Sequence, residues 1–359
     1  MFLKSLKLVN FRNFKNFDIE PGRGINLIVG ENGSGKTALL ESIYYLSLAR
    51  SFRTSNHNAI INFDSKEFFL NAKLFDNNEP DKIHVLGLSR DSYGKILAKL
   101  DGSYISKISV LASNICIQFL SPSSFDLLDG SPSNRREFID WGCFYHFENY
   151  SFYFQQYKQV LKQRNALLQQ KKSNEEILFW TKKFIEISLI INSFREKYLE
   201  IFNEKVKKIF EYFFSNLELQ ISLTPGFKTT VNDFTQQLND SFSKEIMFGY
   251  SLFGPHKSDL KIKINGKNVV DIFSRGQQKL LVIALRISQG LIYEEIIQNN
   301  CIFLIDDLTS ELDKNAQNKL FSYIKNFLNN SQFFITLLSD SYANEINDNQ
   351  NCKIFRLNK

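Results

Sequence analysis

The sequence is poor in cysteine and contains no long apolar run, and each absence excludes a class of protein. Its 359 residues include only four cysteines, and no two of them form a CxxC pair. Scattered cysteines argue against a zinc site or a disulfide framework and are typical of a reducing compartment. The N-terminal stretch is interrupted by Lys4, Lys7 and Arg12, and no later run approaches membrane-spanning length. We therefore expect a cytoplasmic protein, without signal peptide or membrane contact.

The composition is that of a well-packed globular protein with a mild excess of positive charge. Apolar residues make up 43% and charged residues 23%, which suits a chain of about two domains. The 44 Lys and Arg residues against 38 Asp and Glu leave a net charge of +6. Residues 151–210 alone contain twelve Lys or Arg and six Glu. This excess fits either a nucleic-acid surface or a solvated helical face.

Three regions differ in their hydrophobic pattern, and together they predict an α/β fold with a helical insert. Residues 1 to about 120 alternate in short strand-like runs separated by Asn, Asp and Gly. From about 133 to 215 apolar residues recur at helical spacing, with no Gly after Gly142. Strand-like runs return at YSLFG and DLKIKI, followed by a helix after Gly276 and the apolar strand CIFLI. We expect a mixed sheet with flanking helices built from residues 1–124 and 246–359, and a mainly helical lobe from 125–245.

A phosphate-binding loop is the clearest motif in the chain. The run INLIV reads as a strand, GENGSGKT follows it at once, and ALLESIYYLSLA reads as the helix behind it. Glycines allow such a loop to wrap tightly, so that backbone N–H groups and the helix N-terminus converge on phosphate oxygens. Lys36 is expected to neutralise the β and γ phosphates, and Thr37 to bind Mg²⁺. The predicted nucleotide ligands of the loop are Gly30, Glu31, Asn32, Gly33, Ser34, Gly35, Lys36 and Thr37.

A second motif, CIFLIDD, supplies two adjacent carboxylates at the end of an apolar strand. Carboxylates at this place suit both a Mg²⁺ ion and the water that attacks a phosphate. We expect Asp306 to hold the ion, directly or through its waters, and Asp307 to orient or deprotonate the water. The expected catalytic residues are Asp307 and, through its charge on the phosphates, Lys36. The alternative is that Asp307 only caps the following helix.

A third motif, FSRGQQK, places another glycine turn at the start of an apolar helix. One phosphate loop leaves a side of the triphosphate open, and this turn could close it through Ser274, the N–H of Gly276 and Gln277. If two chains pack head to tail, each turn caps the other chain's nucleotide, and ATP joins a two-fold dimer. Taken alone, the same stretch also fits an ordinary capped core helix.

The combined motifs resemble the ABC-type ATPases of the structural-maintenance and DNA-repair branch, and more closely the RecF family of bacterial recombination mediators. The resemblance covers nearly the whole length and rests on NFRNF, the phosphate loop, LSPSSFDLLDGSPSNRREFIDWGCF, LKQRNALL, GPHKSDL, SRGQQKLLVIALRISQG and LIDDLTSELD. It implies an ABC-type ATPase head, ATP and Mg²⁺ as cofactors, and an ATP-induced homodimer. It also implies binding to duplex and gapped, partly single-stranded DNA at the nucleoid. Partners implied in repair, replication and the SOS response are RecR and RecO, and indirectly RecA.

The resemblance also implies roles for single residues. Gln118 would lie in the loop that senses Mg²⁺ and the γ phosphate, as a ligand of both, although a lone Gln after a strand is usually a turn residue. Asp313, in SELD (Ser310 to Asp313), would line the dimer seam. Arg53 could reach phosphate or DNA, or lie on a solvated loop. For His256, in GPHKSDL, we expect structural packing.

One departure from transporter-type ABC ATPases concerns the histidine that follows their next strand. The stretch QFFITLLSD offers only Thr336, Ser339 and Asp340 at this place, and all four histidines lie elsewhere. Without that histidine we expect a slow ATPase that acts as a switch: ATP closes the dimer and hydrolysis releases it.

The basic helical region supplies the candidate DNA contacts. Phosphate contacts of this kind give affinity and salt dependence without sequence readout, and no recognisable base-reading helix is present. Two other classes stay open: a transporter nucleotide-binding subunit would normally carry the absent histidine, and a P-loop kinase would leave SRGQQK and SELD unused. The candidate DNA-binding residues are Arg135, Arg136, Lys158, Lys162 and Arg164.

Overall fold

The computed structural model divides the chain into two compact units. Unit 1, the head, comprises Met1–Ser124 and Arg275–Lys359, and unit 2, the lobe, comprises Phe125–Ser274. No described helix is long and apolar enough to cross a membrane. The described residues are 1–76, 82–121, 124, 126–171, 174–307, 312–327, 331–338 and 352–358.

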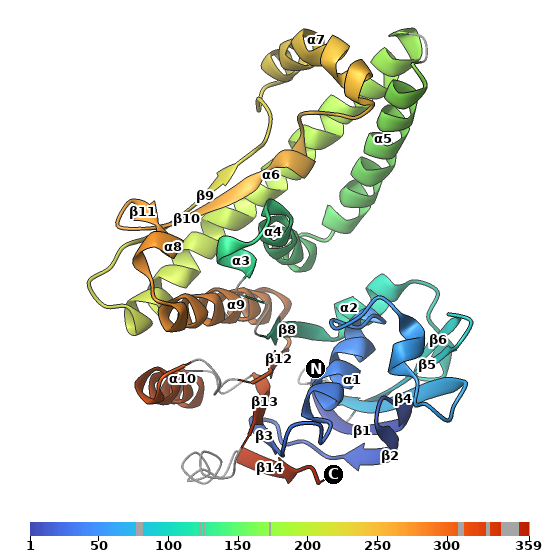
Figure 1. Cartoon of the computed structure of the whole chain (residues 1–359), viewed down its shortest axis with the longest axis vertical. Helices are drawn as coiled ribbons and strands as arrows, with labels where there is room; N and C mark the ends of the chain where they lie inside the picture. The colour runs from blue at the N-terminus through green and yellow to red at the C-terminus, as the bar shows by residue number, and fades with distance from the viewer. Residues whose placement is uncertain are drawn as a thin grey trace. The chain divides into compact units, whose positions relative to one another are not determined.

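The head contains two sheets, four α-helices and one 3-10 turn among its described residues (Figure 1). Its first sheet has the strand order β2-β1-β4-β5-β6-β7, and its second has the order β14-β3-β13-β12-β8. The elements are β1 Phe2–Phe11, β2 Phe14–Ile19, β3 Ile25–Val29, α1 Lys36–Leu48, the 3-10 turn η1 His57–Ile60, β4 Glu67–Phe75, β5 Ile83–Asp91, β6 Ile96–Leu100, β7 Ser103–Tyr104, α2 Ile108–Asn114, β8 Cys116–Leu120, α9 Arg275–Ile297, β12 Cys301–Ile305, α10 Lys314–Phe327, β13 Gln332–Leu337 and β14 Cys352–Arg356.

The first sheet is antiparallel, and only one of its two faces packs on the core of the head. Along β4 exposed and buried residues alternate, and β4 pairs with β1 on one side and β5 on the other. Alternation of this kind is typical of an antiparallel strand with one face on a core and one in solvent. The strands expected in the first 120 residues are therefore present as predicted.

The second sheet is parallel and buried on both faces. All residues of β12 and β13 are buried, as continuous apolar runs in a parallel sheet require. On one side of β12, Phe303 stacks on Phe333 of β13 and fits against Gly290 of α9, where an added Cβ would lie 2.3 Å from the Phe303 ring. Gly290 therefore lets α9 approach the sheet closely.

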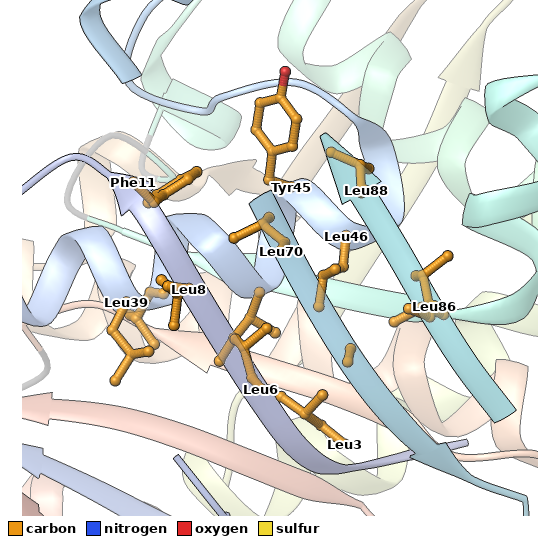
Figure 2. Packing of buried hydrophobic residues seen from close by; sticks show 14 of the residues in the cluster. Leu3, Leu6, Leu8, Phe11, Leu39, Tyr45, Leu46, Leu70, Leu86 and Leu88 are labelled. Carbon is orange, nitrogen blue, oxygen red and sulfur yellow. The ribbon is translucent and has the colours of Figure 1, made fainter. Parts of the chain in front are cut away.

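Helix α1 lies between the two sheets of the head and joins their cores. Figure 2 shows Leu39 and Tyr45 of α1 packed toward Leu8 and Phe11 of β1 and Leu70 of β4. The same buried cluster continues into the second sheet through side chains of β3, β8, β12 and β13. Both ends of the phosphate loop, which connects β3 to α1, are thus anchored in a rigid core.

The lobe is mainly helical and carries a small antiparallel sheet of order β11-β10-β9. Helices α5 and α6 lie side by side, and β9 and β10 run along α6 (Figure 1). Its elements are α3 Asp126–Asp129, α4 Pro132–His146, α5 Tyr150–Gln170, α6 Asn174–Phe213, β9 Leu219–Thr224, α7 Val231–Phe248, the 3-10 turn η3 Pro255–Lys257, β10 Asp259–Ile264, β11 Lys267–Asn268 and α8 Val269–Ile272.

The lobe differs from the sequence expectation at its C-terminal side. The expected return to the head at residue 246 comes later, because β10 pairs with β9 and keeps residues up to Ser274 within the lobe. The strand expected at YSLFG is wrong, since residues 250–254 form no strand. Helix α7 was not predicted, although its Thr230 N-cap, which accepts a hydrogen bond from the N–H of Asp233, is a recognisable start signal.

Candidate nucleotide-binding site

The phosphate loop adopts backbone conformations that favour glycine. Gly33 has φ 86° and Gly35 has φ 103°, both in the left-handed region. A Cβ on Gly35 would lie 2.7 Å from both the Asn13 Nδ2 and the Phe14 Cζ, and a Cβ on Gly30 would lie 2.5 Å from the Ser34 Oγ. The glycines at these three positions are therefore required by the shape of the loop, as the motif predicted.

Lys36, the first residue of α1, turns back over the loop. Its Nζ donates to the carbonyl oxygens of Gly30, at 2.5 Å, and of Glu31, at 2.9 Å. Burial lowers the pKa of the Lys36 ammonium, while the nearby charges of Asp306 and Asp307 oppose this shift. A cation held over the loop by two carbonyls is well placed to bind phosphate oxygens that enter there.

Thr37, Asp306 and Thr336 meet at the carboxyl ends of the parallel strands. The Thr37 Oγ1 donates to the Asp306 Oδ1 at 3.2 Å, and the Thr336 Oγ1 donates to the same oxygen at 2.9 Å. Burial raises the pKa of the Asp306 carboxyl, and the two threonine hydrogen bonds act against this rise. The structure thus brings together the hydroxyl and the carboxylate predicted to hold Mg²⁺.

Asp307 is fixed through its backbone next to this cluster. Its φ is 52°, and its N–H donates to the Thr336 Oγ1 at 2.7 Å. The helix that follows, α10, is capped by Asp313 instead, whose Oδ1 accepts a hydrogen bond from the N–H of Ala316 at 2.8 Å. The alternative interpretation of Asp307 as the cap of the next helix therefore does not hold for α10.

These groups line one cavity of about 790 Å³ in the head. Its wall includes Asn32, Gly33, Gly35, Lys36 and Thr37 of the loop, Asp306, Asp307 and Thr336 of the strands, and residues between Asn58 and Ser65. A volume of this size matches the range of small-molecule sites. The loop and the two carboxylates thus share one accessible site.

The sequence analysis did not assign Arg12 and Asn13, which also line the cavity. Arg12 donates from Nε and Nη2 to both carboxylate oxygens of the fully buried Glu41, at 2.8 and 2.7 Å. The Asn13 side chain lies against Gly35. Both residues belong to the NFRNF motif, and this motif was the feature of the sequence that could have assigned them to the site. Arg53 also lines the cavity, with its Nη1 4.0 Å from the Glu41 Oε2.

The loop and the strand ends fit a Mg²⁺-nucleoside triphosphate. Ser34 is 4% exposed, and its Oγ has no hydrogen-bond partner within the described residues. An unpaired buried hydroxyl is costly, but Ser34, like Gly30 and Glu31, is not among the residues that line the cavity. The Thr37 hydroxyl and the Asp306 carboxylate are hard oxygen donors, which Mg²⁺ prefers.

Other predicted nucleotide ligands lie outside the residues that line this cavity. Gln118 is the middle residue of β8 and is 1% exposed, and its Nε2 donates to the Gln289 Oε1 of α9 at 3.3 Å. The structure therefore does not bring Gln118 to Thr37 and Asp306, and we correct its assignment as a metal ligand in this conformation. Ser274, exposed and directly before α9, and Gly276 and Gln277, in its first turn, do not line the cavity of their own chain.

The candidate DNA contacts in the lobe fall into two groups. Lys158 and Lys162 are exposed one turn apart on α5. Arg135 pairs with Asp259, and Arg136 donates to the carbonyl of Ser258, so both are half-buried. Arg164 is 0% exposed and bonded to other residues of the lobe, so its assignment as a DNA contact is wrong in this structure. Ser310, Ser339 and Asp340 lie outside the described residues.

Comparisons with known proteins identify relatives over the whole chain. Residues 2–359 match the model of the "RecF/RecN/SMC N terminal domain" family. The DNA replication and repair protein RecF of Psychromonas ingrahamii is 39% identical over 339 residues, covering 94% of this chain and 93% of the relative. RecF of Proteus mirabilis is 36% identical over 348 residues, covering 97% and 95%.

Solved structures agree with this assignment. A structure of the recombination mediator protein RecF-ATP in the RecFOR pathway is similar with a TM-score of 0.86 and 27% identity, covering 99% of this chain and 95% of that chain. An Smc head bound to the C-terminal winged-helix domain of ScpA has a TM-score of 0.57 and 16% identity, covering 95% and 91%, and shows the shared fold alone. The chain therefore belongs to the RecF family of DNA replication and repair proteins, within the RecF/RecN/SMC group of ATPases.

Proposed function

We propose that this protein is an ATP-dependent DNA-binding protein of recombinational repair, in which bound ATP joins two chains into a dimer. The observation that carries the proposal is the cluster of Thr37, Asp306 and Thr336 facing the phosphate loop in one cavity. ATP binding is supported further by the RecF-ATP relative, which covers nearly the whole chain.

Different residues of the site bind the phosphates, hold Mg²⁺ and act on the attacking water. Backbone N–H groups of the loop and the Lys36 ammonium bind the phosphates. Thr37 and Asp306 would hold Mg²⁺, which neutralises charge that develops on the phosphates. The Asp307 carboxylate orients the attacking water and accepts its proton.

We infer slow hydrolysis from the absence of a histidine in residues 332–340. Thr336 contributes a neutral hydroxyl, which is committed to the Asp306 carboxylate and the Asp307 N–H. A hydroxyl in this position carries no positive charge that could stabilise the γ phosphate, unlike a protonated histidine. Hydrolysis therefore acts as a timed release of the dimer.

Dimerisation and DNA binding rest on surfaces outside the cavity. The exposed turn at Ser274 and Gly276 caps the nucleotide of a second chain, and Asp313 lies at the seam. The closed dimer binds duplex and gapped DNA through phosphate contacts, and it acts with RecR and RecO to promote RecA loading. The RecFOR pathway in the name of the solved relatives supports these partners. Membership of the RecF family argues against the two alternatives, another ABC-type DNA-repair ATPase and a transporter subunit.

The test is the solution mass of the chain with Mg-ATP, with ADP and without nucleotide, each with and without a gapped duplex. We expect a dimer only with ATP, and tighter duplex binding by the dimer than by the monomer. Lys36→Ala should abolish ATP binding and the dimer together. Ser274→Arg should retain ATP binding and lose the dimer.

Two outcomes would contradict the proposal. If the chain binds ATP and stays monomeric, Ser274 does not cap the nucleotide of a second chain, and ATP does not act as a switch that closes a dimer. A dimer with ATP that binds no DNA would remove the DNA-binding part of the proposal.

A further inference from the structure

A second cavity of the head, of about 540 Å³, lies beside the segment that follows α1. Three arginines and a histidine contribute to its wall, with the side chains of Ser51, Thr54 and Ser55, and its lining residues include no Asp or Glu. Three guanidinium groups around one cavity repel one another unless an anion lies between them. The arginines and the histidine are Arg50, Arg53, Arg90 and His57.

The carboxylate nearest to the cavity does not neutralise these charges. Glu41 is fully buried and already accepts two hydrogen bonds from Arg12 and one from the Ser51 Oγ. Its distance of 4.0 Å to the Arg53 Nη1 is the only ion pair that the described residues give to a cavity arginine. Arg50 and Arg90 form no ion pair within the described residues, so the cavity keeps an excess of positive charge.

Arg90 is the group that most directly indicates a ligand. Its Nη1 donates to the Tyr45 Oη at 2.9 Å, which fixes the guanidinium against α1. Its Nε is buried and has no hydrogen-bond partner in the described part of the chain. A buried N–H of a charged group without an acceptor is unfavourable. Arg90 also lines the cavity, so an oxyanion that enters can pair with its charge.

We propose that this cavity binds a phosphate group through Arg50 and Arg90, while the His57 Nε2, 3.2 Å from the Ser92 carbonyl oxygen, is already engaged there. Arginine forks match phosphate oxygens in geometry as well as charge, and the hydroxyls of Thr54 and Ser55 add donors at the rim. The cavity is larger than a bare phosphate requires and admits an attached sugar. The phosphate belongs to a nucleic-acid strand or to a free anion, since both present the same oxygens. The site does not depend on the proposed ATP function, because Arg50 and Arg90 line this cavity and not the nucleotide cavity, and Arg53 is the one lining residue that the two cavities share.

The test measures binding of inorganic pyrophosphate to the full chain by calorimetry. All variants are made in a Lys36→Ala background, which weakens anion binding at the phosphate loop. Arg50→Gln, at an exposed position, and Arg90→Gln should each weaken pyrophosphate binding about tenfold, the effect of one charge-assisted hydrogen bond. Lys95→Gln removes the same charge from an exposed residue outside the cavity and should leave the affinity unchanged.

A second arm distinguishes the source of the phosphate. Fluorescence anisotropy with a single-stranded oligonucleotide should show the same loss in Arg50→Gln if the site takes a DNA phosphate. Unchanged DNA affinity with weakened pyrophosphate binding assigns the site to a free anion. Equal pyrophosphate affinity in Arg50→Gln, Lys95→Gln and the Lys36→Ala parent would overturn the proposal. The ATP-dependent dimer of the unmodified chain is measured separately, so failure of either proposal leaves the other standing.

Discussion

Among single residues, His256 shows how the lobe holds a titratable group in its neutral form. The ring Nε2 donates to the carbonyl oxygen of Ser251 at 3.0 Å, and the Nδ1 therefore accepts from the Tyr157 hydroxyl at 2.8 Å. Burial, together with the charges of Lys257, Arg136 and Arg164, lowers the pKa of His256 from 6.5 to about 4. The structural role expected for this residue thus has a specific form: it joins α5 to the segment before β10.

The lowered pKa predicts that the lobe loses stability in mild acid. Below about pH 6.5 His256 is protonated in the unfolded chain but not in the folded chain. The free energy of unfolding therefore decreases as the pH is lowered from about 6.5 to about 4. At pH 5 the cost of keeping this residue neutral is about 2 kcal/mol relative to pH 7.5. Urea unfolding at both pH values should show this loss in the parent chain.

The controls are two histidine substitutions. His256→Gln should be less stable than the parent at pH 7.5 but should lose less stability between pH 7.5 and pH 5. His57→Gln, in the head, should retain the pH dependence of the parent. Equal pH dependence in the parent and His256→Gln would show that the residue is protonated in the folded lobe.

At the scale of structural elements, the phosphate loop offers a matched pair of glycines. Both Gly33 and Gly35 have positive φ, but a Cβ on Gly33 meets nothing within 4 Å, whereas one on Gly35 meets Asn13 and Phe14 at 2.7 Å. Gly33→Ala should therefore cost only backbone strain, about 1–2 kcal/mol. Gly35→Ala should displace the loop and weaken ATP binding at least tenfold more than Gly33→Ala, as calorimetry would measure. Similar losses of ATP affinity in both variants would mean that backbone strain, and not the contact with Asn13 and Phe14, causes the loss.

A buried ion pair connects helices α5 and α7 inside the lobe. The Arg164 Nη2 donates to the Glu245 Oε2 at 2.6 Å, both side chains are 0% exposed, and Arg164 also bonds to Thr181 and Ser251. Removing one partner leaves an uncompensated buried charge. Glu245→Ala should therefore lower the free energy of unfolding of the lobe by about 3–5 kcal/mol, measured by urea unfolding.

The matched control for this pair replaces both charges. In the double variant Arg164→Met and Glu245→Met no charge is buried, so much of the lost stability should return. A double variant no more stable than Glu245→Ala would show that the hydrogen bonds to Thr181 and Ser251 matter more than the charge pair.

In this chain, features that depend on local backbone geometry or periodicity were predictable from the sequence, whereas polar pairs between distant elements were not. The loop around Lys36 was predictable because its glycines serve local backbone geometry, and the helices between 132 and 213 because their apolar period is unbroken. The buried state of Arg164 was not predictable, because its partner Glu245 lies on another helix, 81 residues away. The prediction of Gln118 as a metal ligand was wrong for a similar reason, because its hydrogen bond partner Gln289 lies on a helix remote in the sequence. Tertiary pairing of polar groups leaves little local signal.

For the whole molecule, the proposed DNA binding would use positive charge that the lobe exposes on α5. Lys158 and Lys162 are exposed on one face of α5, whereas the arginines first assigned with them are paired or buried. In the proposed dimer two lobes would present this face. Binding through phosphates releases counterions, so affinity falls with salt in proportion to the number of contacts.

The double variant Lys158→Gln and Lys162→Gln should lower DNA affinity and reduce the slope of log affinity against log salt by about 2 for each lobe that contacts a duplex. The control is Lys261→Gln with Lys263→Gln, which removes the same charge from exposed positions of β10 in the same lobe. Fluorescence anisotropy with Mg-ATP at several salt concentrations would measure both slopes. If the two double variants give equal slopes, the lobe attracts DNA only through its total charge, and the α5 face is not a specific contact. If only the α5 variant lowers the slope, the phosphate backbone lies along α5, and base sequence should then have no influence on the affinity.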